Sequence, residues 1–331
     1  MQRWLASWML VCLPFAASAL DVPLTVQGRS FNVHVPPSYD AAQPAPVVVL
    51  LHGFTGTGTG AENYMQFEPL SDEEGFLYLH PNGTLDCLNP PNRFWNATNA
   101  CCNFCRLPVD DVGFLSAVLD ELESQFSVDT DRIYFIGHSN GGFMAYRVAC
   151  ELSDRVAAIV SLAGATWDDP QACNPAEPVH VLQIHGTNDD SILYEGGRIV
   201  FSTYPSALES VEMWASFNGC SPTADTSAPM RDLEGAIGGA ETSVTRYETD
   251  CEHGGSAELW AINGGGHNPV LSGTFSRQVV DYLLARTNES AKVPVPVPAL
   301  SPVGGMGLAM ALAFTGVRSR SRLRGWRKTN R

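Results

Sequence analysis

Two periodicities of hydrophobic and polar residues run along this chain, and they indicate strands and helices. Segments 22–26 and 30–35 alternate apolar and polar residues around Gln27-Gly28-Arg29, the pattern of a β-hairpin. Strand-like apolar runs follow at 47–51, 76–79, 133–136, 157–162, 179–184, 244–249 and 258–262. Between several of these runs, apolar residues recur at helical spacing, in segments 112–126, 143–152, 207–217 and 275–283.

Buried strands that alternate with amphipathic helices are typical of a mostly parallel sheet covered by helices on both faces. The pattern therefore predicts the α/β class, with one sheet of about eight or nine strands. The sequence contains no internal repeat and no sign of a second domain. We place the catalytic domain at residues 20–290.

Both ends of the chain differ from this domain. Arg3, the apolar run 8–15 and the small residues at 17–19 are typical of an export signal, so residues 1–19 are predicted to be a signal peptide cleaved after Ala19. A Pro-rich linker at 291–302 leads to a short hydrophobic helix and a basic tail at 303–331. The tail resembles bacterial C-terminal sorting signals that are recognised by envelope machinery and removed, and a retained membrane anchor is the alternative.

The charge of the domain restricts its partners. Residues 20–290 hold all 35 acidic residues of the chain but only 11 basic ones, every one an arginine. A field of this sign repels phosphate backbones, so nucleic acid is not expected as a partner. It suits a neutral or weakly acidic substrate better than an anionic polymer, and we expect a monomer.

Eight cysteines lie in the domain, an even number that favours disulfides in an exported chain. We expect the pairs Cys150–Cys173 and Cys220–Cys251, because each would tie neighbouring elements together. A zinc site built from Cys101, Cys102 and Cys105 is the alternative, but the spacing is irregular and no histidine lies nearby. No metal and no cofactor is predicted.

A candidate nucleophile lies between a predicted strand and a predicted helix. The segment Gly137-His138-Ser139-Asn140-Gly141 follows the apolar run 133–136 and precedes the helical segment 143–152. A serine at the apex of such a strand–turn–helix is exposed above the edge of the sheet, where it can act as a nucleophile. We therefore predict that Ser139 is the nucleophile of a serine hydrolase.

The partners of this serine are expected later in the chain, in the order acid and then histidine. Asp189 and Asp190 follow the predicted strand 179–184, and His267 follows three glycines after the strand 258–262. Both loops leave the carboxyl ends of strands, where ligands bind in open α/β sheets. We prefer Asp189 as the acid, with Asp190 capping its turn, and His267 as the base.

The remaining candidates concern the oxyanion and the substrate. The backbone N–H of Asn140, at the start of the helix, and that of Phe54, after strand 47–51, are predicted to hold the oxyanion. The Phe54 ring, Trp95 and Trp167 are candidate substrate-binding side chains. Four other features are interpreted as structural: His52 and His185 as hydrogen-bonded residues at strand ends, His138 as a ring that points away from the elbow apex, and Asp110-Asp111 as a helix N-cap.

Motifs in one order along the domain resemble the polyhydroxybutyrate depolymerase-like and feruloyl esterase-like group of secreted α/β-hydrolases. The motifs are Leu51-His52-Gly53, Pro81-Asn82-Gly83-Thr84, Phe94-Trp95-Asn96-Ala97-Thr98, Val109-Asp110-Asp111, Gly137-His138-Ser139-Asn140-Gly141-Gly142, His185-Gly186-Thr187 and Gly264-Gly265-Gly266-His267-Asn268. The resemblance implies the α/β-hydrolase fold, a Ser139–Asp189–His267 triad and hydrolysis of carboxylic esters without a metal. Asp190 departs from the proline common in relatives, Asn268 departs from their Thr-Trp, and Cys87 and Cys105 resemble an added pair around Cys101-Cys102.

We therefore expect an exported serine carboxylic ester hydrolase that acts on feruloyl or acetyl esters of plant polysaccharide. Three alternatives remain: a polyhydroxyalkanoate depolymerase, a serine protease, and a surface-anchored binding protein on a hydrolase scaffold. The protease alternative lacks an extended peptide-site signal, and the presence of all three triad residues argues against the binding protein.

Overall fold

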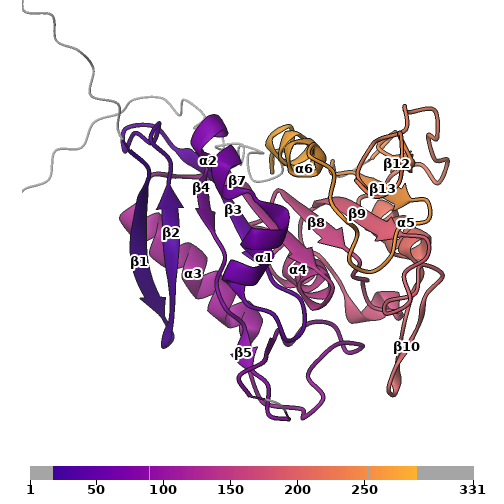
Figure 1. Cartoon of the computed structure of the whole chain (residues 1–331), viewed down its shortest axis with the longest axis horizontal. Helices are drawn as coiled ribbons and strands as arrows, with labels where there is room; N and C mark the ends of the chain where they lie inside the picture. The colour runs from indigo at the N-terminus through magenta and orange to yellow at the C-terminus, as the bar shows by residue number, and fades with distance from the viewer. Residues whose placement is uncertain (1–17, 89, 252–253, 289–331) are drawn as a thin grey trace, which may run out of the picture. The chain divides into compact units, whose positions relative to one another are not determined.

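The computed structural model describes residues 18–88, 90–251 and 254–288 (Figure 1). The predicted signal peptide up to residue 17, the linker at 291–302 and the tail at 303–331 lie outside the described residues. Within the described part, no helix has both the length and the apolar composition needed to cross a membrane.

Nine strands form the main sheet in the order β1-β2-β4-β3-β7-β8-β9-β13-β12. Their bounds are β1 Leu20–Val26, β2 Arg29–Val35, β3 Ala45–Leu51, β4 Leu77–Leu79, β7 Val128–His138, β8 Ala158–Leu162, β9 His180–Gly186, β12 Thr242–Tyr247 and β13 Ala257–Ile262. Neighbours from β4 to β13 are parallel, whereas β1, β2 and β12 pair antiparallel at the two edges. The predicted α/β class with a mostly parallel sheet is confirmed.

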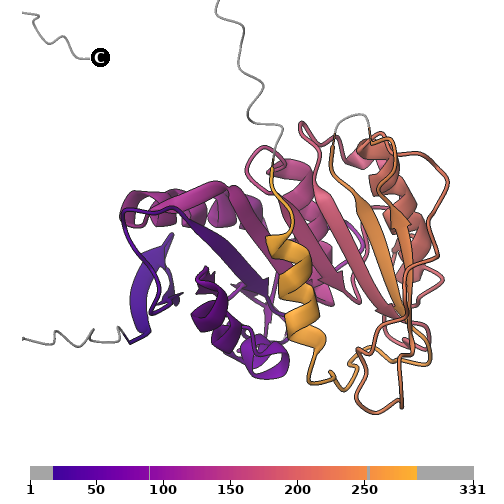
Figure 2. The ribbon, with the colours of Figure 1, turned by 90° about the horizontal axis from the view of Figure 1, so that it is seen from above.

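Helices cover both faces of this sheet. The helices α1 (Gly58–Met65), α2 (Glu68–Glu74) and α6 (Phe275–Leu284) lie on one face, and α3 (Asp111–Gln125), α4 (Asn140–Glu151) and α5 (Ala207–Phe217) lie on the other (Figures 1 and 2). Strand β3 illustrates how one strand contacts both layers of helices. Val47, Val49 and Leu51 pack in the layer of α3, α4 and α5, whereas Val48 and Leu50 pack in the layer of α1, α2 and α6. Alternate residues of a fully buried strand face opposite layers, so the strand is apolar throughout.

The hydrophobic pattern did not predict seven short elements of the described chain. They are α1 and α2, the 3₁₀ helix η1 (Pro170–Ala172), the small ribbon of β5 (Thr84–Leu85) and β6 (Arg93–Phe94), and the hairpin of β10 (Gly197–Ile199) and β11 (Ser202–Tyr204). Their sequences are polar or Gly-rich and too short to show a period. Both the ribbon and the hairpin belong to long connections that leave the sheet at the end where its parallel strands finish.

The two acidic residues at the start of α3, Asp110 and Asp111, have different roles. Asp110 accepts a hydrogen bond from the Gly113 N–H at 2.8 Å and is the predicted N-cap. Asp111 is instead fully buried, pairs with Arg29 at 2.7 Å and accepts from the Asn96 N–H at 2.7 Å. The prediction that Asp111 caps the helix is therefore wrong, because its carboxylate anchors the loop that carries Asn96.

Four disulfides join the eight cysteines of the domain. The expected pairs Cys150–Cys173 and Cys220–Cys251 are both present. The Cys87–Cys105 pair ties the β5–β6 turn to the connection between β6 and α3, and the Cys101–Cys102 pair lies within that connection. Sulfur in a disulfide is not a thiolate ligand, so the zinc alternative loses the ligands on which it depended.

Candidate active site

Ser139 occupies a sharp turn between the central strand β7 and helix α4. Its backbone has φ 53° and ψ −119°, a conformation that non-glycine residues seldom adopt. The flanking glycines permit the turn: a side-chain carbon at Gly137 would lie 2.0 Å from the Gly141 oxygen, and one at Gly141 would lie 2.1 Å from the Leu51 oxygen. The motif therefore brings the strand and the helix into close contact and leaves the serine at the apex.

Two loops at the ends of β9 and β13 are joined to each other by hydrogen bonds. The Gly264 N–H donates to Thr187 Oγ1 at 2.8 Å, and the Asn188 N–H donates to the Gly265 oxygen at 2.9 Å. A side-chain carbon at Gly186 would lie 2.3 Å from that same oxygen, so only glycine fits there. This contact brings the loop that carries Asp189 against the loop that carries His267.

Three side chains distant in sequence converge at this edge of the sheet. His267 Nε2 lies 2.9 Å from Ser139 Oγ, and His267 Nδ1 lies 2.8 Å from Asp189 Oδ2. In the neutral tautomer with its proton on Nδ1, His267 donates to Asp189 and accepts from the serine hydroxyl. These distances are those of a nucleophile, a general base and an orienting carboxylate.

The surroundings of Asp189 keep it ionised. Its Oδ1 accepts from the N–H groups of Ser191 and Ile192, each at 2.8 Å, and its Oδ2 also lies 3.2 Å from His185 Nε2. Burial opposes the charge, but the hydrogen bonds from His185 and His267 outweigh it and hold the pKa of Asp189 well below its usual range. Asp190 is exposed, and among the described residues its side chain accepts one hydrogen bond, from the Ser191 hydroxyl at 3.3 Å.

A buried chain of hydrogen bonds supports the carboxylate from behind. Tyr146 donates to Gln183 Oε1 at 2.9 Å, and Gln183 Nε2 donates to His185 Nδ1 at 2.9 Å. Because its Nδ1 accepts, His185 carries its proton on Nε2, which faces Asp189 and the Ile192 oxygen. His185 is thus hydrogen-bonded, as its position at a strand end predicted. Gln183 was not singled out from the sequence, although a polar residue inside a buried apolar strand was an available signal.

His138 also contacts the residues that converge at this edge of the sheet. Its Nε2 lies 3.0 Å from the backbone oxygen of His267, and the two rings lie 5.1 Å apart. Burial lowers the pKa of His138 to about 4, so the ring is neutral at neutral pH. The ring lines the same cavity as Ser139, which corrects the prediction that it points away from the elbow apex.

The predicted oxyanion donors lie beside the nucleophile. A side-chain carbon at Gly53 would lie 3.4 Å from Ser139 Cβ, so the loop after β3 packs directly against the elbow. Other backbone amides of this loop are already hydrogen-bonded: the Thr55 N–H donates to the Arg93 oxygen and the Gly56 N–H donates to the Gly53 oxygen. Within the described chain, the N–H groups of Phe54 and Asn140 have no acceptor. Both are thus free to bind a negatively charged oxygen.

A cavity of about 450 Å³ opens at the triad. Ser139, His138 and His267 line it together with the loop 52–57, Tyr64 and Asn268. The half-buried Phe54 ring is part of this wall. The cavity therefore places Phe54, with its unpaired amide, and Ser139 around one space.

The two tryptophans proposed to bind substrate lie elsewhere. Trp95 is fully buried: its ring stacks on Phe114, and its indole N–H donates to the His52 oxygen at 3.1 Å. Its backbone is held by the Asn140 side chain, so Trp95 is a core residue and the prediction of substrate stacking is wrong. Trp167 is 9% exposed and lines a second, larger cavity rather than that of the triad.

The chain is similar to known proteins in sequence and in fold. A sequence model described as the alpha/beta hydrolase fold matches residues 46–207. Feruloyl esterase B of Piromyces equi is 29% identical over 250 residues, which cover 72% of this chain and 42% of that protein. Feruloyl esterase C of Emericella nidulans is 26% identical over 261 residues, covering 77% of this chain and 82% of that protein. The chain thus spans less than half the length of the first relative and most of the second.

Among solved structures, an acetyl xylan esterase from Aspergillus awamori matches with a TM-score of 0.54. The two chains are 17% identical, and the match covers 81% of this chain and 99% of the other. At this identity the likeness concerns the fold, and it confirms the architecture that the sequence motifs implied.

Proposed function

We propose a mechanism for this chain, an esterase of the α/β-hydrolase fold related to feruloyl and acetylxylan esterases. Ser139 is the nucleophile, His267 the general base and then general acid, and Asp189 the residue that orients and stabilises the imidazolium. The Phe54 and Asn140 amides form the oxyanion hole. The observation that carries the proposal is the pair of contacts of His267, at 2.9 Å to Ser139 and at 2.8 Å to Asp189.

The reaction proceeds in two halves. Ser139 Oγ attacks the ester carbonyl while its proton moves to His267 Nε2, and the carbonyl oxygen takes up negative charge between the two amides. Collapse of this intermediate breaks the bond to the alcohol, which leaves with the proton from His267. Water then attacks the acyl-serine with His267 as base, and the carboxylic acid is released with Ser139 restored.

For the substrate we propose feruloyl or acetyl esters of plant polysaccharide. Support comes from the relatives, which are named feruloyl and acetyl xylan esterases, and from the acidic domain, which suits a neutral substrate. We also propose that the chain is exported. The signal-like pattern of residues 1–19 and four disulfides support this, because disulfides persist in oxidising compartments.

A panel of three esters tests the proposal. Methyl ferulate, p-nitrophenyl acetate and a hydroxybutyrate oligomer are incubated with the full chain and with Ser139→Ala. We expect release of ferulate and acetate by the wild-type chain alone, with circular dichroism showing both proteins folded. Preferential cleavage of the hydroxybutyrate oligomer would replace the polysaccharide assignment by a polyester one, and equal activity of Ser139→Ala would remove the mechanism.

A further inference from the structure

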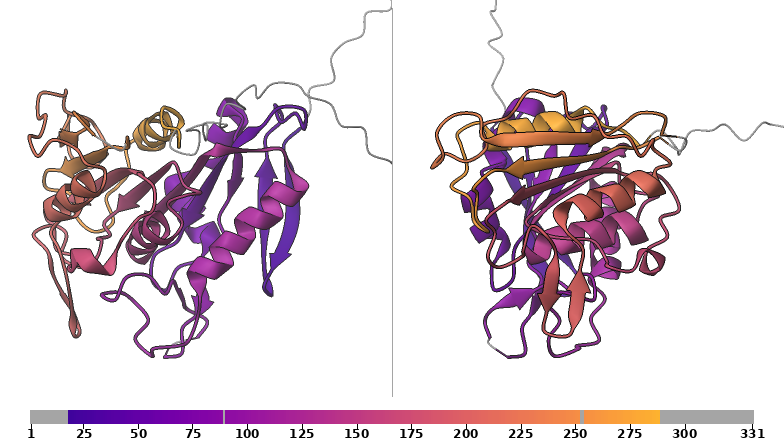
Figure 3. Two further views of the ribbon diagram at one scale, coloured as in Figure 1. Left: turned by 180° about the vertical axis from the view of Figure 1, so that it is seen from behind. Right: turned by 90° about the vertical axis from the view of Figure 1, so that its right-hand side faces the viewer.

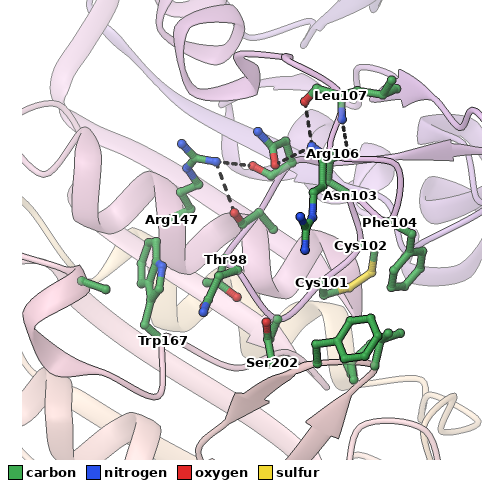
Figure 4. Close-up of a pocket in the computed structure, with 18 of the residues that line it drawn as sticks. Thr98, Cys101, Cys102, Asn103, Phe104, Arg106, Leu107, Arg147, Trp167 and Ser202 are labelled. Atoms are coloured by element: carbon green, nitrogen blue, oxygen red, sulfur yellow. Dashed lines mark hydrogen bonds between the residues drawn. A yellow bond between two sulfur atoms is a disulfide. The ribbon is translucent and has the colours of Figure 1, made fainter.

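A second cavity, of about 990 Å³, lies beside the triad cavity and has more than twice its volume. Its walls come from residues 96–107, from Trp167 and Ala172 after β8, and from residues 199–202 at the tip of the β10–β11 hairpin (Figure 4). The loop before α3 and this hairpin project from the same end of the domain, as Figures 1 and 3 show. None of the three catalytic residues lines this cavity.

The walls are held in place by covalent and polar contacts. The Cys87–Cys105 and Cys101–Cys102 disulfides tie the first wall, and the Arg147 guanidinium of α4 donates to the Asn96 oxygen at 2.7 Å. On the other side, the Thr203 hydroxyl donates to Asp168 at 2.5 Å and fastens the hairpin to the segment that carries Trp167. Binding sites are commonly formed in advance in this way, because less ordering is then needed when the ligand binds.

A pair of aromatic rings in contact lies between the two cavities. Phe54 lines the triad cavity and Phe104 lines the larger one, and their ring centroids lie 5.4 Å apart in an edge-to-face arrangement. Asn140, which follows the nucleophile, also lies 3.6 Å from Cys101 Sγ on the wall of the larger cavity. A substrate bound at Ser139 therefore has two neighbouring spaces for its second half. One is the larger cavity across these rings, and the other is a cavity of about 540 Å³ that shares Tyr64 and Asn268 with the triad cavity.

The chemistry of the walls suits a sugar chain. Phe104 is 41% exposed and Phe201 is 80% exposed, so two aromatic side chains are presented to solvent at the rim, and Trp167 adds a third aromatic ring. Exposed apolar groups gathered at a cavity mark ligand sites, and flat rings can cover the apolar C–H face of a sugar. Thr98 on the wall has a buried hydroxyl with no partner within the described chain. Buried polar groups normally have a partner, which a hydroxyl-bearing ligand could supply.

Arg106 adds a charge to this rim. It is exposed, and among the described residues it makes no ion pair, although the domain holds 35 acidic residues against 11 arginines. The other arginine that lines the cavity differs, because Arg147 is paired with Glu151 at 2.7 Å. An unpaired guanidinium at the rim of a cavity in an acidic domain is suited to a carboxylate of the ligand.

We propose that this cavity is a glycan subsite, which binds sugar rings on the alcohol side of the ester that Ser139 attacks. The acyl group occupies the triad cavity next to Phe54, the sugar rings lie against Phe104, Trp167 and Phe201, and Arg106 favours a uronic acid substituent. The inference rests on the proposed ester hydrolysis for its link to catalysis, but sugar binding itself can be measured without it.

Binding is measured first, on the full chain carrying Ser139→Ala. Calorimetric titration uses two unesterified probes, a neutral xylo-oligosaccharide and one that carries a glucuronic acid branch. We expect both to bind and the acidic probe to bind more tightly. Phe201→Ser weakens both about fivefold, as expected for one lost aromatic contact. Arg106→Gln removes the preference for the acidic probe, and Met230→Ser, a change of another exposed apolar residue outside the cavity, leaves binding unchanged.

Kinetics on the active chain then separates the two sides of the ester. Phe201→Ser is expected to raise KM about fivefold for a feruloylated xylo-oligosaccharide and to leave KM for methyl ferulate, which has no sugar, unchanged. An equal rise for both esters would mean that the cavity holds the aryl group, and the glycan proposal would fall. Ester hydrolysis without oligosaccharide binding would also overturn the glycan subsite while leaving the proposed function intact. Oligosaccharide binding without hydrolysis would leave the subsite and remove the proposed function.

Discussion

Replacing Asp189 by asparagine isolates the role of one carboxylate oxygen. Oδ1 of Asp189 accepts from the Ser191 and Ile192 N–H groups, which hold the oxygen of the new amide in the same place. The NH₂ group of Asp189→Asn must then take the place of Oδ2, opposite His267 Nδ1 at 2.8 Å and His185 Nε2 at 3.2 Å. The NH₂ group, a hydrogen-bond donor, would then face two further donors, His267 Nδ1–H and His185 Nε2–H. His267 relieves the conflict by moving its proton to Nε2, and it can then no longer accept the serine proton.

The expected loss is large and specific. A base held in the wrong tautomer lowers kcat by about 10⁴, which corresponds to about 5.4 kcal/mol of transition-state stabilisation. Asp190→Asn is the matched control, because Asp190 is exposed and its one hydrogen bond within the described chain is to Ser191. We expect this variant to change kcat by less than about twofold.

The assay is the steady-state hydrolysis of p-nitrophenyl acetate at neutral pH by the wild-type chain and the two variants. Urea unfolding of each protein checks that the fold is retained. Small and equal losses from both variants would refute the assignment of Asp189. A large loss in Asp190→Asn alone would transfer the role to its neighbour.

Three further predictions concern the support of the site. Gln183→Leu leaves His185 Nδ1 without its donor, and we expect kcat to fall about tenfold with KM unchanged and the pH profile of kcat shifted; an unshifted profile would mean a merely structural role. Burial lowers the pKa of His52 to about 4, so the folded protein keeps this ring neutral at pH values where the unfolded chain protonates it. The contribution of the neutral ring to the free energy of unfolding is therefore fully present above about pH 6.5 and is lost as the pH falls toward 4. On acidification through this range the wild-type chain should therefore lose about 2 kcal/mol more unfolding free energy in urea than His52→Gln; equal losses would contradict the argument. Arg29→Gln leaves the fully buried Asp111 carboxylate without its cation, so we expect the free energy of unfolding in urea to fall by about 3 kcal/mol. A fall of less than about 1 kcal/mol would contradict this expectation.

The central parallel strands of this fold could be predicted because most of them are runs of buried apolar residues. Strand β3 is the clearest example, since all seven of its residues are buried. Helix α1 could not be predicted in the same way, because Gly58–Met65 is short, contains two glycines and buries only its two terminal residues. Where burial is confined to a few positions, the period in the sequence disappears.

The residues of the site also differ in how far their sequence neighbours reveal their surroundings. Ser139 and His267 stand in motifs with their own local geometry, an elbow and a glycine run, so each could be identified from its neighbours. The environment of Trp95 could not, because its polar sequence neighbours suggest exposure while His52 and Phe114, distant in the chain, enclose it. The role of Gln183 could not be predicted from its sequence neighbours either, because packing of the fold brings its partners Tyr146 and His185 to it.

The most direct test of the central claim is covalent labelling of the full chain with a fluorophosphonate, followed by mass spectrometry of the digested protein. We expect one adduct per chain, on the peptide that contains Ser139, and a labelling rate at least about 10²-fold lower in His267→Ala, because the base activates the hydroxyl. Labelling on another serine, or equal rates in the wild-type chain and His267→Ala, would contradict it.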